Sequence, residues 1–168
     1  MILVYFKEGS KNKNIVEQLL KEYGEEFKEV GDNHLEQTLV QVFSNQDEAV
    51  SNQKYEDFLF LDTMKPETIQ QFARELNQKG VHIGRVAVRT ENNVSWKLGD
   101  LMEEVDQEFR YFLLRDRLYE LVSHPDKERL EKDPSYLKLM SSIYALIEDP
   151  KTPYEDLKRA LVILTEKK

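Results

Sequence analysis

The sequence predicts a small α/β fold followed by an all-helical region, and two observations carry this prediction. Short apolar runs of strand-forming residues alternate with helical periodicity as far as residue 96, whereas apolar residues after it recur only at helical spacing. Strands that alternate with helices are typical of a mainly parallel sheet with right-handed crossovers. We expect a four-stranded, mainly parallel sheet with flanking helices in residues 1–96, and a helical extension of three helices in residues 97–168.

The first half of the α/β region begins with an apolar run at residues 2–6, which predicts a buried strand. A helix is expected next, because the apolar residues between Ile15 and Tyr23 share one helical face and Gly24 suits its C-terminal end. Residues 27–30 predict a second strand, and a turn follows it.

Residues 34–43 fit two different structures. Leu35, Leu39 and Phe43 fall at helical spacing, whereas the alternation from Thr38 to Val42 is that of a strand. We favour the helix. A strand here would instead give a mixed sheet of ferredoxin-like character. The polar stretch that follows predicts a loop.

The clearest strand–helix–strand signal lies in the second half of the α/β region. Residues 58–61 predict a buried strand, and Pro66 suits the first turn of the next helix. That helix has an apolar face and ends at Gly80, after which residues 81–88 predict a fourth strand.

The region after the last strand predicts three helices, separated by breaks at Pro125 and Pro150. The first of these helices is apolar on several sides, so the later helices or another subunit must cover it. We therefore take Phe109, Phe112 and Leu113 as a candidate interaction surface.

The composition excludes several classes of function. The absence of cysteine excludes disulfides, thiol catalysis and cysteine-based zinc sites. The chain carries 24 basic and 32 acidic residues, a net charge of −8, and residues 1–96 hold 11 of the basic and 16 of the acidic ones, so neither part is basic. Nucleic acid and membrane surfaces are therefore not expected partners. No apolar stretch approaches the roughly 20 residues of a membrane span, and we expect a cytoplasmic protein.

Three loops follow predicted strands, at the carboxyl ends where parallel sheets usually bind ligands. They are residues 7–14, 62–65 and 89–96, and we expect them to meet. The first holds one glycine, one serine and three lysines before a helix, a setting that can favour an anion. It matches no phosphate-binding motif, and a solvated loop with a helix cap is the simpler interpretation.

Asp62 directly follows a predicted strand, in the sequence Leu-Asp-Thr-Met-Lys-Pro. This segment resembles the phosphoacceptor strand of response-regulator receiver domains, and the resemblance implies a phosphorylatable or metal-binding carboxylate. The chain departs from receivers after the first strand, where Lys7 and Glu8 stand in place of two acidic residues, and it shows no fifth strand. The alternative is that Asp62 caps the following helix.

Thr90, Asn93 and Trp96 form the pattern T-x-x-N-x-x-W between a strand and an amphipathic helix. The helix continues the pattern with Leu98, Leu101 and Glu104. The whole resembles the signature of a bacterial family named domain of unknown function 3783, over residues 55–110. The resemblance implies no reaction.

Two interpretations of this segment stay open. In the structural one, Thr90 and Asn93 form a turn and a helix cap, and Trp96 anchors the helix to the sheet. In the functional one, Asn93 and Trp96 line a crevice beside Asp62 that holds a planar or polar ligand. Asp62, Thr90, Asn93 and Trp96 are accordingly the candidate ligand-binding residues.

The absence of catalytic motifs favours a non-catalytic interaction or regulatory module. His34, His82 and His124 lie far apart and form no metal-binding spacing, and we expect no catalytic residue, metal or cofactor. The expected partner is another protein or a second copy of the chain, bound through the helical extension. The alternative is a small-molecule-binding protein or enzyme that uses the crevice at Asp62, Asn93 and Trp96.

Overall fold

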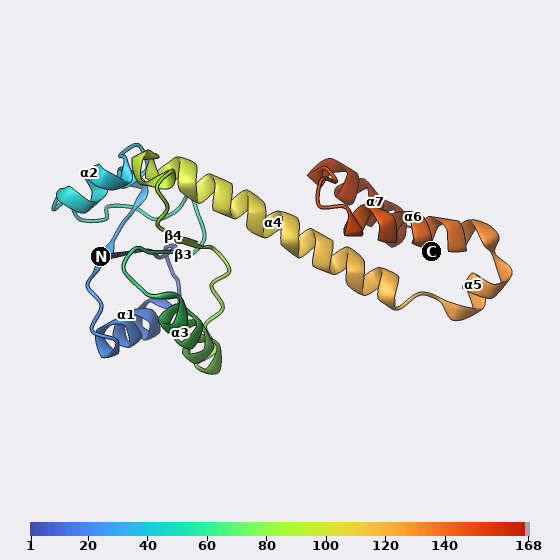
Figure 1. Ribbon diagram of the computed structural model, residues 1–168, viewed down its shortest axis with the longest axis horizontal. Helices are drawn as coiled ribbons and strands as arrows, with labels where there is room; N and C mark the ends of the chain where they lie inside the picture. Colours follow the sequence, from blue (N-terminus) through green and yellow to red (C-terminus); the bar gives the residue numbers. More distant parts are fainter. Residues whose placement is uncertain (167–168) are drawn as a thin grey trace. The chain divides into compact units, whose positions relative to one another are not determined.

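The computed structural model describes residues 1–166, which form two compact units (Figure 1). The first unit, Met1–Gln107, is an α/β domain, and the second, which begins at Glu108, is helical. The predicted fold class is confirmed, because a four-stranded sheet with flanking helices precedes a helical region. The predicted domain boundary after residue 96 remains a prediction. The long helix α4 (Leu98–Ser123) contributes residues to both units.

The sheet consists of β1 (Ile2–Tyr5), β2 (Phe27–Glu29), β3 (Phe58–Leu61) and β4 (Val86–Val88). Its strand order is β2-β1-β3-β4. β1 and β2 are parallel, β3 and β4 are parallel, and the central pair β1 and β3 is antiparallel. β4 is shorter than the predicted strand at residues 81–88, because only its last three residues pair with β3.

β1 and β3 are buried on both faces, which explains their uninterrupted apolar sequences. Side chains alternate along a strand, so Ile2 and Val4 pack on one face of the sheet while Leu3 and Tyr5 pack on the other. The side chains of β3 alternate in the same way, so β3 adds buried side chains to the layers on both faces of the sheet.

Two pairs of helices cover the two faces of this sheet (Figure 1). One face packs against α1 (Lys13–Glu22) and α3 (Pro66–Gln78). The other packs against α2 (Leu39–Ser44) and the beginning of α4. We call these two layers of buried side chains the α1–α3 core and the α2–α4 core.

The ambiguous residues 34–43 contain a helix, as we favoured. A short 3-10 turn, η1 (Asp32–His34), precedes α2, and the Thr38 side chain caps the helix by accepting a hydrogen bond from the N–H of Gln41 (3.3 Å). Thr38 also forms a single antiparallel bridge with Lys97. The strand-like signal at Thr38 therefore corresponds to one bridge, and the strand alternative is wrong.

The expectation that all three strand-end loops meet is wrong for residues 7–14. β3 runs antiparallel to β1, so its carboxyl end lies at the opposite edge of the sheet. The connection that reverses the direction is the linker, residues 45–57, which contains no helix or strand. The Asn52 side chain bonds the carbonyls of Phe6 (2.7 Å) and Val30 (3.2 Å), so the linker crosses the carboxyl ends of β1 and β2 and starts β3 from that edge.

The helical unit contains the second part of α4, then α5 (Lys127–Lys132), α6 (Pro134–Glu148) and α7 (Tyr154–Glu166). We predicted three helices over this region, and α5 is an additional short one. The Tyr111 hydroxyl donates to the carbonyl of Thr152 (2.9 Å) and ties α4 to the turn before α7. Among the described residues, no helix has the length and apolar character needed to cross a membrane. The buried core of this unit consists of Leu118, Ile143, Ile147, Leu157 and Ala160.

Candidate functional site

Asp62 is a nearly buried carboxylate at the carboxyl end of β3, with 8% of its side chain exposed. Its Oδ1 lies 3.2 Å from Nη1 of Arg89, and its Oδ2 lies 3.5 Å from the amine of Met1. Oδ1 accepts no hydrogen bond within the described part of the chain, so Arg89 compensates its charge without a well-aligned bond. The helix that follows has Lys65 at its N-cap without a side-chain cap bond. The helix-cap interpretation of Asp62 is therefore wrong.

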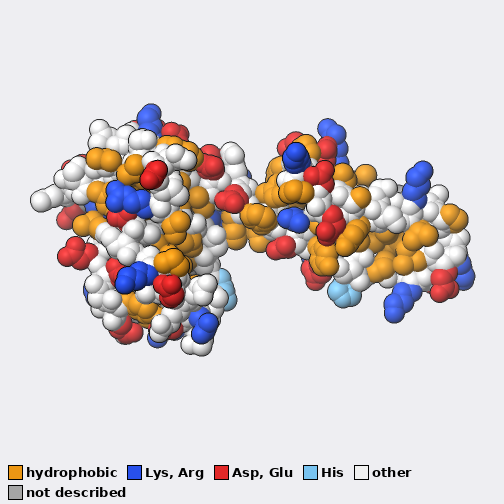
Figure 2. All heavy atoms as spheres, in the orientation of Figure 1, with side chains coloured by type: hydrophobic (Ala, Val, Ile, Leu, Met, Phe, Trp, Pro, Cys, Tyr) orange, Lys and Arg blue, Asp and Glu red, His pale blue; other side chains and the backbone are white. Residues whose placement is uncertain are grey.

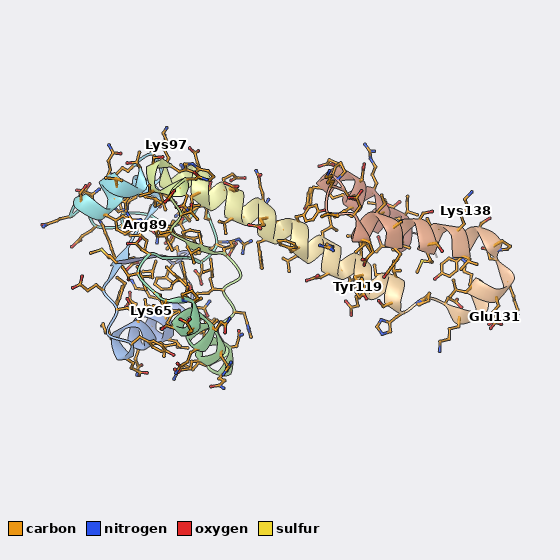
Figure 3. All side chains as sticks on the ribbon, viewed as in Figure 1. Lys65, Arg89, Lys97, Tyr119, Glu131 and Lys138 are labelled. Atoms are coloured by element: carbon orange, nitrogen blue, oxygen red, sulfur yellow. The ribbon has the colours of Figure 1, made fainter. Side chains whose placement is uncertain are left out.

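Arg89 was not among the residues that we singled out from the sequence. Its side chain, labelled in Figure 3, is 48% exposed. Its guanidinium carbon lies 5.9 Å from the centre of the Phe43 ring. A cation over an aromatic face is attracted by the ring's quadrupole. Arg89 thus links the buried carboxylate to the surface of α2.

Thr90 and Asn93 hold each other in a turn between β4 and α4. The N–H of Thr90 donates to Oδ1 of Asn93 (2.9 Å), and the N–H of Asn93 donates to Oγ1 of Thr90 (3.1 Å). The Asn93 amide also donates to the carbonyl of Val88 (2.9 Å), and Asn93 is only 7% exposed. These bonds are the turn of the structural interpretation, and a ligand-binding role for either residue remains a prediction.

Trp96 is half-buried and packs against the α2–α4 core. Its carbonyl accepts a hydrogen bond from the N–H of Leu39 (3.0 Å), so its backbone also joins α4 to α2. Within residues 1–166, no hydrogen bond or ion pair connects Asp62 with Asn93 or Trp96. The structure therefore supports the anchor role of Trp96 more directly than the crevice role.

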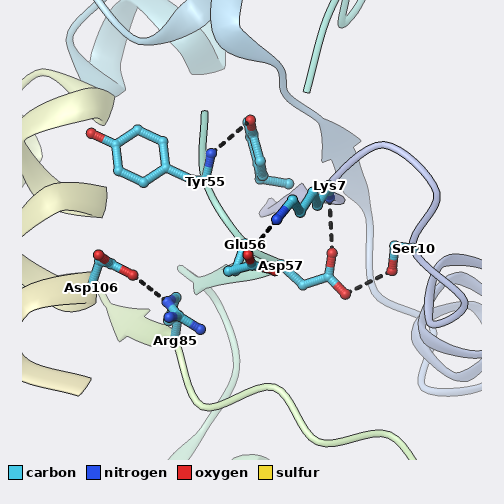
Figure 4. A network of polar contacts seen from close by, with 8 residues as sticks. Lys7, Ser10, Tyr55, Glu56, Asp57, Arg85 and Asp106 are labelled. Carbon is cyan, nitrogen blue, oxygen red and sulfur yellow. Dashed lines mark hydrogen bonds and ion pairs between the residues drawn. The ribbon is translucent and has the colours of Figure 1, made fainter. Parts of the chain in front are cut away.

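The loop that we considered for phosphate binding holds an anion from its own chain, Asp57 (Figure 4). Oδ1 of Asp57 accepts from the N–H of Lys7 (2.9 Å). Its Oδ2 accepts from the hydroxyl of Ser10 (2.7 Å) and from the side-chain amide of Asn12 (2.8 Å). These donors would otherwise suit a bound anion. The loop therefore ties the end of β1 to the beginning of β3.

Two surface clefts border the linker rather than Asp62. One, of about 430 Å³, lies between residues 6–10 and residues 49–53. The other, of about 560 Å³, lies between β2 and residues 45–49. Both are lined mainly by polar and backbone groups. These clefts were not predictable from the sequence, because the linker that borders them has no periodicity.

His34 is fully buried, which the sequence did not reveal. Its Nδ1 accepts from the N–H of Gly31 (3.0 Å), and its Nε2 lies 3.2 Å from the carbonyl of Asp47. The first bond requires that Nδ1 carries no proton, so the neutral ring donates through Nε2. Burial lowers the pKa of His34. This histidine is part of the packing between η1 and the linker.

Arg85 and Asp106 form a buried ion pair that we did not expect (Figure 4). An acidic residue on an amphipathic helix is usually solvated, and nothing in the sequence indicates otherwise for Asp106. In the structure it is 4% exposed, and its Oδ1 lies 2.5 Å from Nε of Arg85. A helical pattern cannot show that an arginine before β4 covers one acidic position of α4.

The fold and these contacts define a small α/β domain with an ion-paired carboxylate at the carboxyl edge of β3 and β4. Residues 57–112 of the chain match the model of the family described as Domain of unknown function (DUF3783). The family resemblance is therefore confirmed over this segment, which begins just before β3 and ends within α4. Comparisons with curated proteins and with solved structures found no match.

Proposed function

We propose that this chain is a non-catalytic interaction module that associates with a second copy of itself through its helical unit. The observation that carries the proposal is the exposure of large apolar side chains. Of 13 such side chains among the described residues, eight lie after residue 108, and hydrophobic atoms are visible over this unit in Figure 2. They are Phe112, Leu113, Tyr119, Leu137, Tyr144, Tyr154, Val162 and Ile163.

Four of these side chains are arranged around one aromatic contact between α4 and α6. Phe112 and Tyr119 lie seven residues apart on α4, and Leu137 and Tyr144 lie seven residues apart on α6, so each pair shares a helical face. The rings of Tyr119 and Tyr144 meet, with their centres 6.4 Å apart. We call these four residues the seam strip. Exposed apolar side chains that gather on one part of a protein surface mark interaction sites.

The interaction surface predicted from the sequence overlaps the seam strip at Phe112. Phe109, Phe112 and Leu113 share a face of α4 because they are spaced three and four residues apart. Phe112 is 46% exposed and Leu113 is 52% exposed, whereas Phe109 is half-buried. Phe112 belongs to both sets and is the residue of choice for a test.

The distribution of charge supports a second copy as the occupant. Residues 1–107 carry 12 basic and 20 acidic residues, whereas residues 108–168 carry 12 of each. The whole net charge of −8 therefore belongs to the first unit. Two helical units can approach each other without net repulsion, whereas a contact between two α/β units would oppose like charges.

We expect Phe112→Glu to weaken self-association at least tenfold, because it places a carboxylate within an apolar contact. Sedimentation velocity over a range of concentrations measures this change. Val40→Glu is the matched control, since Val40 is 55% exposed on α2 and lies outside the helical unit. This variant should associate as the unchanged protein does.

A chain that stays monomeric at every concentration would contradict the proposal. So would a folded Phe112→Glu variant that associates with unchanged affinity. Circular dichroism of both variants shows whether they are folded.

A small-molecule site at Asp62 is the second candidate function. It is favoured by one observation, the buried Oδ1 that accepts no hydrogen bond within the described residues. Native mass spectrometry of gently purified protein tests it. A bound small molecule that is lost in Asp62→Ala would support this site, and bare protein peaks would count against it.

A further inference from the structure

The α/β unit contains the same sequence of elements twice. The first half consists of β1, α1, β2, the 3-10 turn η1 and α2. The second consists of β3, α3, β4, the 3-10 turn η2 (Asn93–Ser95) and the beginning of α4. In each half the two strands are parallel neighbours, and the two helices lie on opposite faces of the sheet.

The strand pairing relates the halves by a twofold axis. Ile2 pairs with the first residue of β2, as Leu59 pairs with the first residue of β4, so Ile2 and Leu59 occupy equivalent positions. The next residues, Leu3 and Phe60, are then equivalent to each other. They are also partners in the antiparallel pairing of β1 and β3. Because Leu3 and Phe60 are equivalent residues that pair with each other, the twofold axis passes between them.

The two halves meet across the same twofold axis a second time where α2 and α4 begin. Thr38 and Lys97 each directly precede one of these helices, and they form a bridge with each other. The N–H of Leu39, the residue after Thr38, donates to the carbonyl of Trp96 (3.0 Å). The N–H of Leu98, the residue after Lys97, donates to the carbonyl of Gln37 (2.9 Å). Exchanging the two halves exchanges these two hydrogen bonds.

The ends of α1 and α3 are also alike. Gly24 and Gly80 follow these helices with φ of 69° and 79°, the left-handed conformation that ends many helices at glycine. Each glycine N–H bonds the carbonyl three residues earlier, at 3.0 Å in both cases. The residue after each glycine bonds the carbonyl five residues earlier, at 3.0 and 2.9 Å.

The buried polar residues His34 and Asn93 play the same structural role in the two halves, because each side chain accepts a hydrogen bond from a backbone N–H of its turn. The N–H of Gly31, two residues after β2, donates to the side chain of His34 (3.0 Å). The N–H of Thr90, two residues after β4, donates to the side chain of Asn93 (2.9 Å). Both acceptors lie three residues after the donor and are buried.

We propose that residues 1–44 are a second, diverged copy of the domain that the family match identifies in residues 57–112. The matched copy presents a self-pairing surface, formed by the edge of β3 and the segment before α4, and the partner that fits it is another copy of the same domain. Few residues are identical between the copies, which explains why the match covers only one of them. Gly24 with Gly80 and Leu39 with Leu98 are two identical pairs.

The copies differ at their carboxyl edges. A Cβ on Gly31 would lie 2.6 Å from Oδ1 of Asn52, so glycine there lets the linker lie on the first copy. The equivalent residue of the second copy is Thr90. The second copy instead has the Asp62–Arg89 pair at its edge. Each copy has therefore specialised, one to receive the linker and the other to hold a buried carboxylate.

Sequence profiles of homologues test the common origin of the copies. One profile is built for residues 1–44 and one for residues 57–103, and the two are aligned. We expect a score above that of shuffled profiles, with Gly24 aligned to Gly80 and Leu39 aligned to Leu98. A best alignment in another register, or a score within the shuffled range, would overturn the proposal.

A substitution tests the equivalence of the two turns in the full chain. His34→Leu leaves the N–H of Gly31 without its acceptor, and we expect its Tm to fall by about 4–8 °C. His34→Asn supplies an amide oxygen like that of Asn93, and we expect less than half of that fall. A His34→Asn variant as unstable as His34→Leu would overturn the equivalence.

The pH dependence of the Tm provides a second test of the His34→Asn substitution. Because burial lowers the pKa of His34, the unfolded chain takes up a proton at higher pH than the folded one. The contribution of His34 to stability is thus complete above its ordinary pKa of about 6.5 and is lost as the pH falls below it. His34→Asn should show a smaller loss of Tm between pH 7 and pH 5 than the unchanged protein, and an equal loss would count against the assigned turn.

Discussion

Arg85→Met is expected to lower the free energy of unfolding by about 3 kcal/mol. The substitution keeps the apolar stem of the side chain and removes the guanidinium that lies 2.5 Å from Asp106. The Asp106 side chain is 5% exposed, so its carboxylate would lose this cation in a place where water cannot replace it. Urea unfolding followed by tryptophan fluorescence measures the change, because Trp96 is the single tryptophan and lies in the α/β unit.

An exposed ion pair of the same unit provides the control for this prediction. Lys97 and Glu36 lie 2.8 Å apart, but their side chains are 50% and 87% exposed. We expect Glu36→Gln to change the free energy of unfolding by no more than about 0.5 kcal/mol, because exposed pairs are screened by water. Equal effects of Arg85→Met and Glu36→Gln would contradict the buried character of the Arg85–Asp106 pair.

A disulfide between residues 38 and 97 is expected to stabilise the protein by about 4 kcal/mol. Thr38 and Lys97 form an antiparallel bridge, and the hydrogen bonds flank them, so they are a non-hydrogen-bonded pair with closely spaced Cα atoms. The chain has no cysteine of its own, so Thr38→Cys with Lys97→Cys gives a single defined thiol pair. The bond would restrict a long loop of the unfolded chain. Urea midpoints of the oxidised and reduced variant measure the stabilisation.

Val40→Cys with Lys97→Cys is the control pair for the disulfide. Val40 is 55% exposed on α2 and is not the bridge partner of Lys97. This pair should oxidise more slowly and should stabilise less. Failure of the 38–97 pair to oxidise, or equal behaviour of both pairs, would contradict the crossing of the two halves at Thr38 and Lys97.

Local sequence signals were enough to predict the elements of the α/β unit. The apolar runs of β1 and β3, Pro66 at the start of α3 and the glycines that end α1 and α3 depend only on neighbouring residues. The fold class follows from the order of these elements. The position of Asp62 at a strand end was predictable for the same reason.

The direction of β3 was not predictable, because it depends on contacts far apart in the sequence. The linker has no periodicity, and its path is set by side-chain bonds such as those of Asn52 and Asp57. A parallel arrangement was the natural expectation for alternating strands and helices. The antiparallel centre of the sheet instead separates the loop after β1 from Asp62.

The ion-pair partners within the α/β unit were equally unpredictable from the sequence. An acidic residue on a helix is usually solvated, and nothing near Asp106 in the sequence indicates that Arg85 covers it. Asp62 and Arg89 are likewise joined only when β3 and β4 pair. Residue type and spacing therefore predicted where a carboxylate lies but not which cation compensates it.

Hydrogen–deuterium exchange at several protein concentrations tests the proposed function most directly. If the helical unit binds a second copy through the seam strip, amides in residues 112–119 and 137–144 should exchange more slowly as the concentration rises. Amides of α1 and α3 should exchange at the same rate throughout, and they serve as the internal reference. Exchange in α4 and α6 that does not depend on concentration would contradict self-association through this surface.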